Sequence, residues 1–238
     1  MSNVAMIFAG GSGKRMNTNG RPKQFLELHG KPILIYTLEL FDNHPFIDGI
    51  VVVCIKDWID YLKKMLRKFE INKVVEIVKG GESGQSSIYN GLEACANHFD
   101  DDSIVLIHDG VRPLIIDKTI TDNINCVKEN GNCITCVPAT ETFVVQYGDS
   151  LMIPDRKRSL LARAPQSFRL GDILKAHRRA ILENKMNFID SCSMMTHYGG
   201  KMHTIIGPME NIKITTPTDF FVFKAMVEVH ENQQIFGF

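Results

Sequence analysis

Residues 4–16, VAMIFAGGSGKRM, join an apolar run to a glycine-rich turn, and this junction is the most informative stretch for the fold class. The run VAMIFA is short and wholly apolar, as expected of a strand that is buried on both faces of a parallel sheet. Gly10, Gly11 and Gly13 follow, and glycines in such a turn let backbone N–H groups point inward around phosphate oxygens. The junction predicts an α/β sheet with a phosphate-binding loop after its first strand.

The glycine turn does not match the two best-known phosphate loops. A Walker A loop needs GxxxxGK[ST], but Phe8 stands five residues before Gly13, and Arg15 stands where Ser or Thr should bind magnesium. A dinucleotide fingerprint needs a third glycine, and Met16 takes its place, which weighs against a hydride-transferring dehydrogenase. Arg15 and the later Lys23, in PKQ, instead suit a reaction in which negative charge builds up on phosphorus. The alternative is that both are solvated loop charges.

The composition predicts one soluble domain. Among 238 residues, 27 Lys plus Arg balance 27 Asp plus Glu, so the overall charge favours neither nucleic acid nor a membrane surface as a partner. No apolar stretch approaches the ~18 to 20 residues of a membrane span. The N-terminus also lacks the order of segments that is typical of a signal peptide. We therefore expect a cytoplasmic protein with a single domain over 1–238.

The six cysteines lie mostly in apolar segments, without the spacing of a zinc site or a secreted disulfide framework. Cys133 and Cys136 form a CxxC, but on an expected strand, where residues three apart point to opposite faces. We expect all six to be reduced, most of them in the core.

Short β-rich runs alternate with amphipathic stretches up to Pro138, which predicts a mostly parallel sheet with helices on both faces. After Pro138, TFVVQYGDSLMIP has two β-prone runs around a Tyr-Gly-Asp turn and predicts a projecting hairpin, an arm over about 139–160. DRKRSLLARAPQSF, 155–168, is interpreted as a polar segment. The expected strands are 3–9, 48–54, 74–78, 103–107, 132–138 and 203–206, and the expected helices are 32–42, 56–69, 85–97, 117–130, 171–183, 190–198 and one from about 217.

Two further segments follow expected strands. HDGVRP places Asp109 and Arg112 at the carboxyl end of a strand, where ligands bind in open α/β sheets. Asp109 could hold a metal or a ribose hydroxyl and Arg112 a phosphate, but a pair that merely holds the loop explains both equally well. GGESGQSS, 80–87, could bind a base or phosphate through its amides and serine hydroxyls, and helix capping is the alternative.

Taken in order, AGGSGKRM, PKQ, GGESGQSS, HDGVRP, RAPQSF and ENIKITTP resemble the motifs of the cytidylyltransferases that act on 2-C-methyl-D-erythritol 4-phosphate and of their relatives that act on ribitol 5-phosphate. Each motif alone is weak, but the ordered set covers nearly the whole chain. The resemblance implies a Rossmann-like nucleotidyltransferase fold and a homodimer joined by the arm. It also implies Mg²⁺-dependent transfer of CMP from CTP to a sugar-alcohol phosphate, with release of pyrophosphate.

The resemblance also implies roles for individual residues. Arg15 and Lys23 would stabilise charge at the α-phosphate under attack, and Asp109 and Arg112 would face the sugar-phosphate acceptor. Asp109 is also the residue expected to bind the metal, from its position after the strand. Lys213 would bind the acceptor phosphate, and Arg156 on the arm would reach the partner's site. The implied catalytic residues are Arg15, Lys23, Lys213 and Arg156; the substrate-binding residues are Asp109, Arg112, Arg156, Ile189 and Lys213; the nucleotide-binding residues are Ala9, Gly10, Gly11, Gly13, Gly81, Ser87, Asp109 and the Gly110 backbone.

Two positions depart from the family pattern. Gly84 stands where many members have Arg, and Ile189 where members of the isoprenoid pathway commonly have Thr. Because Ile189 cannot bond an acceptor hydroxyl, we expect ribitol 5-phosphate or a similar pentitol phosphate, used for wall or capsule polymers. The plainer interpretation is that Ile189 packs against the helix expected from Asp190. Methylerythritol phosphate is the alternative acceptor, and a nucleotide-binding subunit without turnover is the alternative of another class.

Overall fold

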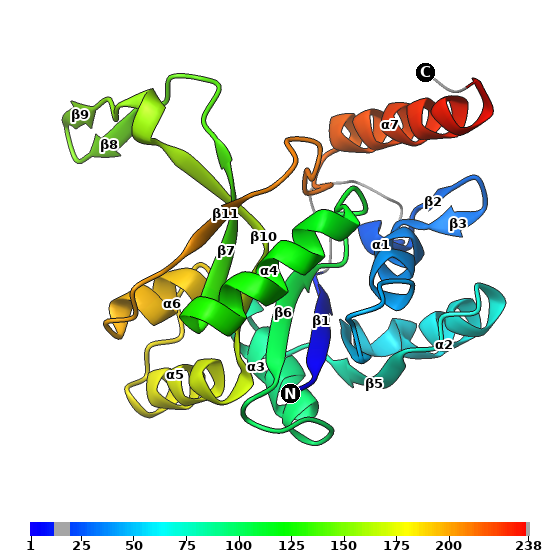
Figure 1. Ribbon diagram of the computed structural model, residues 1–238, viewed down its shortest axis with the longest axis horizontal. Helices are drawn as coiled ribbons and strands as arrows, with labels where there is room; N and C mark the ends of the chain where they lie inside the picture. Colours follow the sequence, from blue (N-terminus) through cyan, green and yellow to red (C-terminus); the bar gives the residue numbers. More distant parts are fainter. Residues whose placement is uncertain (12–19, 237–238) are drawn as a thin grey trace.

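The computed structural model describes residues 1–11 and 20–236, and Figure 1 shows the course of the chain. Its centre is a seven-stranded sheet in which β10 runs antiparallel to both neighbours and all other adjacent pairs are parallel. The predicted mostly parallel sheet is therefore confirmed. In spatial order the strands are β11 (Thr204–Ile206), β7 (Asn132–Pro138), β10 (Leu160–Arg169), β6 (Ile104–Asp109), β1 (Asn3–Ala9), β4 (Gly49–Cys54) and β5 (Val74–Lys79).

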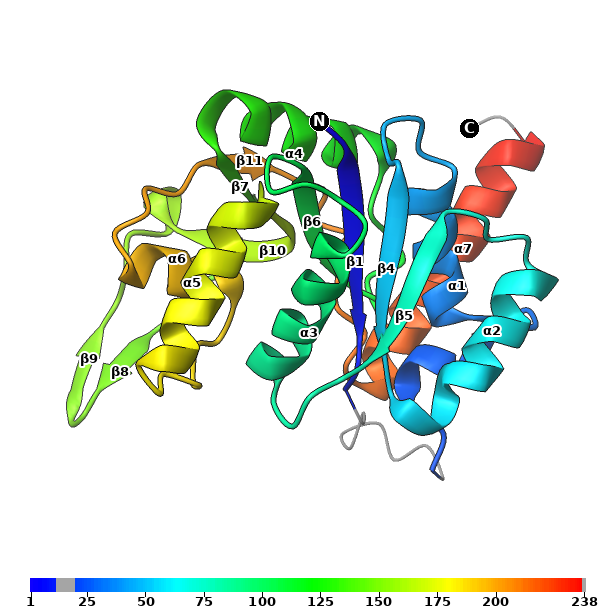
Figure 2. The same ribbon diagram turned by 90° about the horizontal axis from the view of Figure 1, so that it is seen from below.

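Helices cover both faces of the sheet because alternate side chains of each strand point to opposite faces. Ala5 and Ile7 of β1 belong to one buried cluster, and Val4 and Met6 belong to the other. Figure 2 shows the helices of the second cluster in front of the strands. The first cluster is completed by α1 (Ile33–Asp42), α2 (Ile59–Lys68) and α4 (Asp117–Asn130), the second by α3 (Gly84–Ala96) and α5 (Leu170–Leu182).

The sequence interpretation of 155–168 as a polar segment is wrong for its second half, which is part of β10 between β6 and β7. The pattern concealed the strand because its first three residues are exposed and its pairing register with β7 shifts between Ala162 and Gln166. Ser167 and Phe168 are fully buried beyond that shift.

The predicted arm is present as a hairpin of β8 (Val145–Tyr147) and β9 (Ser150–Met152) that stands away from the sheet (Figures 1 and 2). Gly148 takes φ +56° in the turn, a conformation that glycine adopts without strain. The side chains of Tyr147 and Leu151 are more than half exposed. Exposed apolar side chains on a hairpin are typical of a surface that another chain covers, so contact with a second subunit remains a prediction.

The remaining elements lie close to their expected ranges. The expected helix 56–69 begins as a 3-10 turn, η3 (Lys56–Trp58), before α2. All six cysteines are free, and all except Cys192 are buried, as expected. Within 1–11 and 20–236, no helix has the length and apolar character needed to cross a membrane. The other elements are η2 (Lys23–Phe25), β2 (Glu27–Leu28), β3 (Lys31–Pro32), η4 (Arg156–Arg158), α6 (Ser191–His197) and α7 (Pro217–Phe236).

Candidate functional site

A cavity of about 570 Å³ opens where β6 ends, as expected for a ligand site in an open α/β sheet. Its walls come from the end of β6, the start of α3, the middle of β10 and the segment 186–191. The charged residues among its described lining are Asp109, Arg112, Arg163, Asp190 and Lys213. Three of these five were predicted from sequence as site residues, and Arg163 and Asp190 were not.

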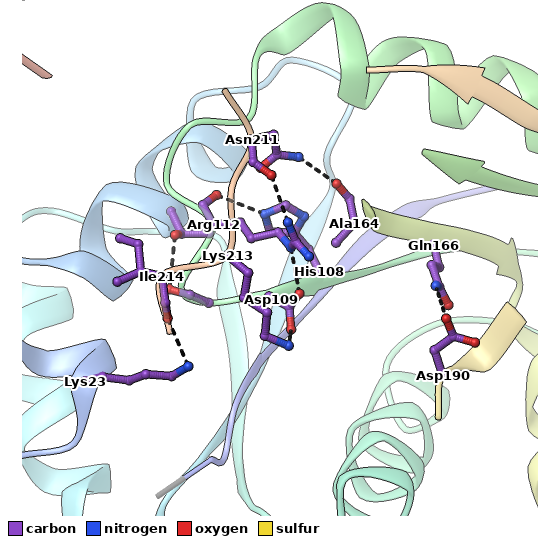
Figure 3. A network of polar contacts seen from close by, with 12 residues as sticks. Lys23, His108, Asp109, Arg112, Ala164, Gln166, Asp190, Asn211, Lys213 and Ile214 are labelled. Atoms are coloured by element: carbon purple, nitrogen blue, oxygen red, sulfur yellow. Dashed lines mark hydrogen bonds and ion pairs between the residues drawn. The ribbon is translucent and has the colours of Figure 1, made fainter. Parts of the chain in front are cut away.

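Asp109 is the centre of the charged cluster. Its Oδ1 accepts from Lys213 Nζ at 2.7 Å, and its Oδ2 accepts from Arg112 Nε at 2.8 Å (Figure 3). Burial alone would raise the pKa of Asp109, but the charges of Lys213 and Arg112 lower it to about 2. The carboxylate is therefore ionised at neutral pH and holds two cations beside the cavity. The Asp–Arg pair considered from sequence is present, with Lys213 as a third member.

Asn211 fixes this cluster to the neighbouring strand. Its backbone carbonyl accepts from Arg112 Nη1 at 2.8 Å, and its buried side chain donates from Nδ2 to the carbonyl of Ala164 at 2.7 Å. Sequence reasoning assigned no role to Asn211. The signal that could have found it is its place in ENIKITTP, two residues before Lys213.

Lys23 reaches the same region from a distant part of the chain. It begins η2, and its Nζ donates to the carbonyl of Ile214 at 2.9 Å, beside Lys213. The next residue, Gln24, is buried and donates from Nε2 to the carbonyls of Ala9 at 2.6 Å and Gly11 at 3.1 Å. PKQ is thereby tied to the start of the glycine turn. The structural role of Gln24 was missed, although its position beside Lys23 was a signal.

The glycine turn after β1 lies beside the turn before α3. A Cβ on Gly10 would come 3.6 Å from both Gly80 Cα and Ser87 Oγ, so the two turns are in close contact. Ala9 is buried at the end of β1 and Gly11 is exposed. Gly13 and Arg15, which were also predicted here, lie outside the described residues.

The serines of GGESGQSS have structural roles. Ser83 is the N-cap of α3 and exchanges hydrogen bonds with Ser86 in a capping box, as the capping alternative predicted. Ser87 Oγ accepts from Gly81 N–H at 2.9 Å and donates to the carbonyl of Ser83 at 2.8 Å. Glycine is needed at position 81 because a Cβ there would collide with the Ser86 side chain. Contacts of Gly81 and Ser87 with a nucleotide remain predictions.

Gly110, the first residue after β6, is held on both sides. Its N–H donates to the carbonyl of Phe8 at 2.9 Å, and its carbonyl accepts from Thr37 Oγ1 at 3.1 Å. A Cβ at this position would come 2.7 Å from Leu34 Cδ1. Since the N–H is already bonded, the predicted nucleotide contact of this backbone would use the second lone pair of the carbonyl.

Two buried histidines line the cavity and are neutral at pH 7. Burial lowers the pKa of His108 and of His177 to about 4. His108 donates from Nε2 to the carbonyl of Arg112 at 3.2 Å, the tautomer that a carbonyl acceptor requires. His108 therefore supports the loop that carries the charged cluster.

Ile189 lies at the edge of the cavity with its side chain 95% exposed. The interpretation that it packs against the following helix is wrong, because a side chain this exposed has no such packing. The adjacent Asp190 is the N-cap of α6, where its Oδ1 accepts from Ser193 N–H at 2.8 Å and its Oδ2 accepts from Gln166 Nε2 at 2.9 Å. Gly84, at the start of α3, also lines the cavity, and a Cβ there would meet open space.

Arg156 does not line the cavity of its own chain. It lies exposed in η4 at the base of the arm, where its Nη1 donates to the carbonyl of Thr140 at 3.4 Å. The predicted role of Arg156 therefore requires a second copy of the chain.

No group of three or more His, Cys, Asp or Glu side chains comes together as a metal site in the described part of the chain. Both oxygens of Asp109, the predicted metal ligand, contact cations. A metal at Asp109 would thus need most of its ligands from bound substrate and water.

Known proteins resemble the whole chain. A sequence model of the family described as 2-C-methyl-D-erythritol 4-phosphate cytidylyltransferase matches residues 3–229. A ribitol-5-phosphate cytidylyltransferase of Vibrio parahaemolyticus is 54% identical over 99% of this chain and 100% of its own. A 2-C-methyl-D-erythritol 4-phosphate cytidylyltransferase of Clostridium kluyveri is 36% identical over 97% of this chain and 98% of its own. The crystal structure of 4-diphosphocytidyl-2C-methyl-D-erythritol synthase from Anaerococcus prevotii superposes with a TM-score of 0.82 at 26% identity, over 95% of this chain and 96% of that one.

Proposed function

Because the chain belongs to the family of 2-C-methyl-D-erythritol 4-phosphate cytidylyltransferases and is a CTP-dependent cytidylyltransferase, we propose that its acceptor is ribitol 5-phosphate and its product CDP-ribitol. The observation that carries this choice is Ile189, an exposed apolar side chain at the cavity edge where a hydroxyl would favour methylerythritol phosphate. The higher identity to a relative named for ribitol 5-phosphate supports the same choice.

In the proposed reaction, an oxygen of the acceptor phosphate attacks the α-phosphorus of CTP. A new P–O bond forms, the bond to the β-phosphate breaks, and pyrophosphate leaves with the electron pair. A phosphate monoester has a second pKa of about 6, so most of it is dianionic at neutral pH and needs no general base. This fits a cavity in which Asp109, with a pKa of about 2, stays ionised at neutral pH and is a poor general base.

The cations have separate proposed tasks. Lys23, beside the glycine turn, and Arg15 stabilise the charge that develops at the α-phosphate, since fixed cations act most strongly where charge grows in the transition state. Lys213 binds the acceptor phosphate, and Asp109 keeps Lys213 and Arg112 in position for it. The glycine turn and the turn of Gly81 and Ser87 hold the nucleotide.

Mg²⁺ is the proposed metal, entering with CTP. Mg²⁺ is commonly bound through substrate phosphates and one or two carboxylates, which agrees with a described lining whose carboxylates are Asp109 and Asp190, the latter already bonded to Gln166 and Ser193. When bound, the ion would neutralise part of the triphosphate charge. A cytoplasmic location remains a prediction from the sequence.

The acceptor proposal predicts a higher kcat/KM for ribitol 5-phosphate than for 2-C-methyl-D-erythritol 4-phosphate, measured side by side as CTP-dependent pyrophosphate release. Ile189→Thr should shift the ratio toward methylerythritol phosphate by an amount corresponding to about 1 to 3 kcal/mol, because the new hydroxyl can bond that acceptor. Ile189→Val is the matched control, since Val has the shape of Thr without the hydroxyl. Far better turnover of methylerythritol phosphate by the wild type would overturn the choice of acceptor.

We also propose a homodimer in which the arm brings Arg156 into the partner's site. Mixing inactive Arg156→Ala and Lys23→Ala chains should then restore about a quarter of the wild-type activity, because random pairing makes half of the dimers mixed, each with one intact site. Mixing Lys23→Ala chains with Asp109→Asn chains is the control and should restore no activity. Each of these changes damages the site of the chain that carries it, so neither site of a mixed dimer is intact. If size-exclusion and subunit exchange show mixed dimers but activity stays absent, Arg156 does not act in trans.

A further inference from the structure

We propose that Arg163 is an anion-binding residue of the acceptor subsite and that it binds the phosphate group of the sugar-alcohol phosphate. The identity of the acceptor in this proposal rests on the proposed function. The presence of an anion site at Arg163 does not. Arg163 belongs to β10, is partly buried and lines the same cavity as Asp109 and Lys213.

The guanidinium of Arg163 has no acidic partner among the described residues. Its Nε is buried without a hydrogen-bond partner. Burial and then the nearby charge of Arg112 lower the pKa of Arg163, and no carboxylate of the described residues offsets these two effects. A desolvated cation that is next to another cation is destabilised unless an anion joins it.

The other charged residues that line the cavity have partners within the chain. Arg112 bonds Asp109 and the carbonyl of Asn211, and Lys213 pairs with Asp109. Asp190 accepts from Gln166 and from the start of α6. Within the described lining, Arg163 is thus the charged side chain whose charge a ligand would have to balance, and its planar guanidinium suits bidentate binding of a phosphate.

The position of Arg163 favours the acceptor phosphate over the triphosphate of CTP. Figure 3 shows Lys23 and Ala164, the neighbour of Arg163, on opposite sides of Asp109. The triphosphate is proposed to lie at the glycine turn, on the side of Lys23. The acceptor phosphate lies between the two sides because its oxygen attacks the α-phosphorus, so Arg163 can contact it from the β10 side.

Arg163→Gln should raise the KM for the acceptor about 10- to 100-fold, the usual effect of losing a charged hydrogen bond, while the KM for CTP stays within about twofold. Arg163→Lys should recover part of the loss, since it restores the charge without the planar fork. The matched control is Arg178→Gln, which removes an exposed arginine paired with Glu93 and should leave both constants unchanged.

The melting temperature separates a binding role from a structural one. Without ligand, Arg163→Gln should melt at or above the wild-type temperature, because the change removes an unpaired charge that Arg112 repels. Inorganic phosphate should raise the melting temperature of the wild type more than that of the variant, since a ligand stabilises the state that binds it. A lower melting temperature of the variant with both KM values raised would overturn the proposal in favour of a structural arginine.

Other results would also test the role of Arg163. A rise confined to the KM for CTP assigns Arg163 to the nucleotide, and a change confined to the dimer dissociation constant assigns it to a partner carboxylate; either result overturns the proposal. If the wild type prefers methylerythritol phosphate, the choice of ribitol 5-phosphate fails, but a selective rise in the KM for that acceptor still supports Arg163 as its phosphate ligand.

Discussion

Lys23→Ala is expected to lower kcat about 10² to 10³-fold while CTP still binds, which is the usual loss when one donor to a developing charge is removed. Lys23 lies in η2 next to Gln24, whose bonds to Ala9 and Gly11 place this segment against the glycine turn. Its ammonium therefore lies near the proposed position of the α-phosphate. The measurements are pyrophosphate release at saturating substrates and CTP binding by calorimetry.

The control for this experiment is Lys118→Ala, which removes an exposed lysine paired with Asp122 on α4, outside the described lining of the cavity. Its kinetics should equal those of the wild type. Circular dichroism should show that Lys23→Ala keeps the fold. Near-normal turnover of a folded Lys23→Ala chain would rule out the proposed role of Lys23 in the transition state.

Asp109→Asn should lower the free energy of unfolding by about 3 to 5 kcal/mol at pH 7, because it removes the only carboxylate that contacts Arg112 and Lys213 among the described contacts. The two cations would then face each other across a neutral amide. Turnover should also fall by about two orders of magnitude, since both cations lose the group that positions them. Urea denaturation and pyrophosphate release measure the two effects.

The dependence on pH tests the electrostatic cause. The folded-state pKa of Asp109, about 2, is below its unfolded value, so its ionisation stabilises the fold above about pH 4 and this contribution disappears as the pH falls toward 2. The difference in the free energy of unfolding between the wild type and Asp109→Asn should become smaller as the pH falls from about 4 toward 2. Glu93→Gln, which breaks an exposed pair with Arg178, should change stability by less than about 1 kcal/mol. An equally small effect of Asp109→Asn would show that the cluster does not depend on its charge.

Much of the fold could be predicted because local sequence patterns indicate it. The apolar run of β1 and the alternation that follows predict a covered parallel sheet, since such strands are apolar on both faces. The two β-prone runs around Gly148 predicted the arm. β10 could not be predicted in the same way: its first three residues are exposed, its register shifts after Ala162, and its burial between β6 and β7 depends on segments far away in the chain.

The fold class, the motif order that places the chain in its family and the residue types of the site follow from local periodicity and short motifs, and could therefore be predicted from the sequence. How those residues combine depends on the tertiary structure. Lys23 contacts Ile214, the neighbour of Lys213 in the chain, because the chain returns to the same region after 191 residues. That return also brings Lys213 to Asp109, while Arg163 lies near Arg112 and pairs with no carboxylate among the described residues. Such pairings are set by strand order and long-range packing, which no local pattern encodes.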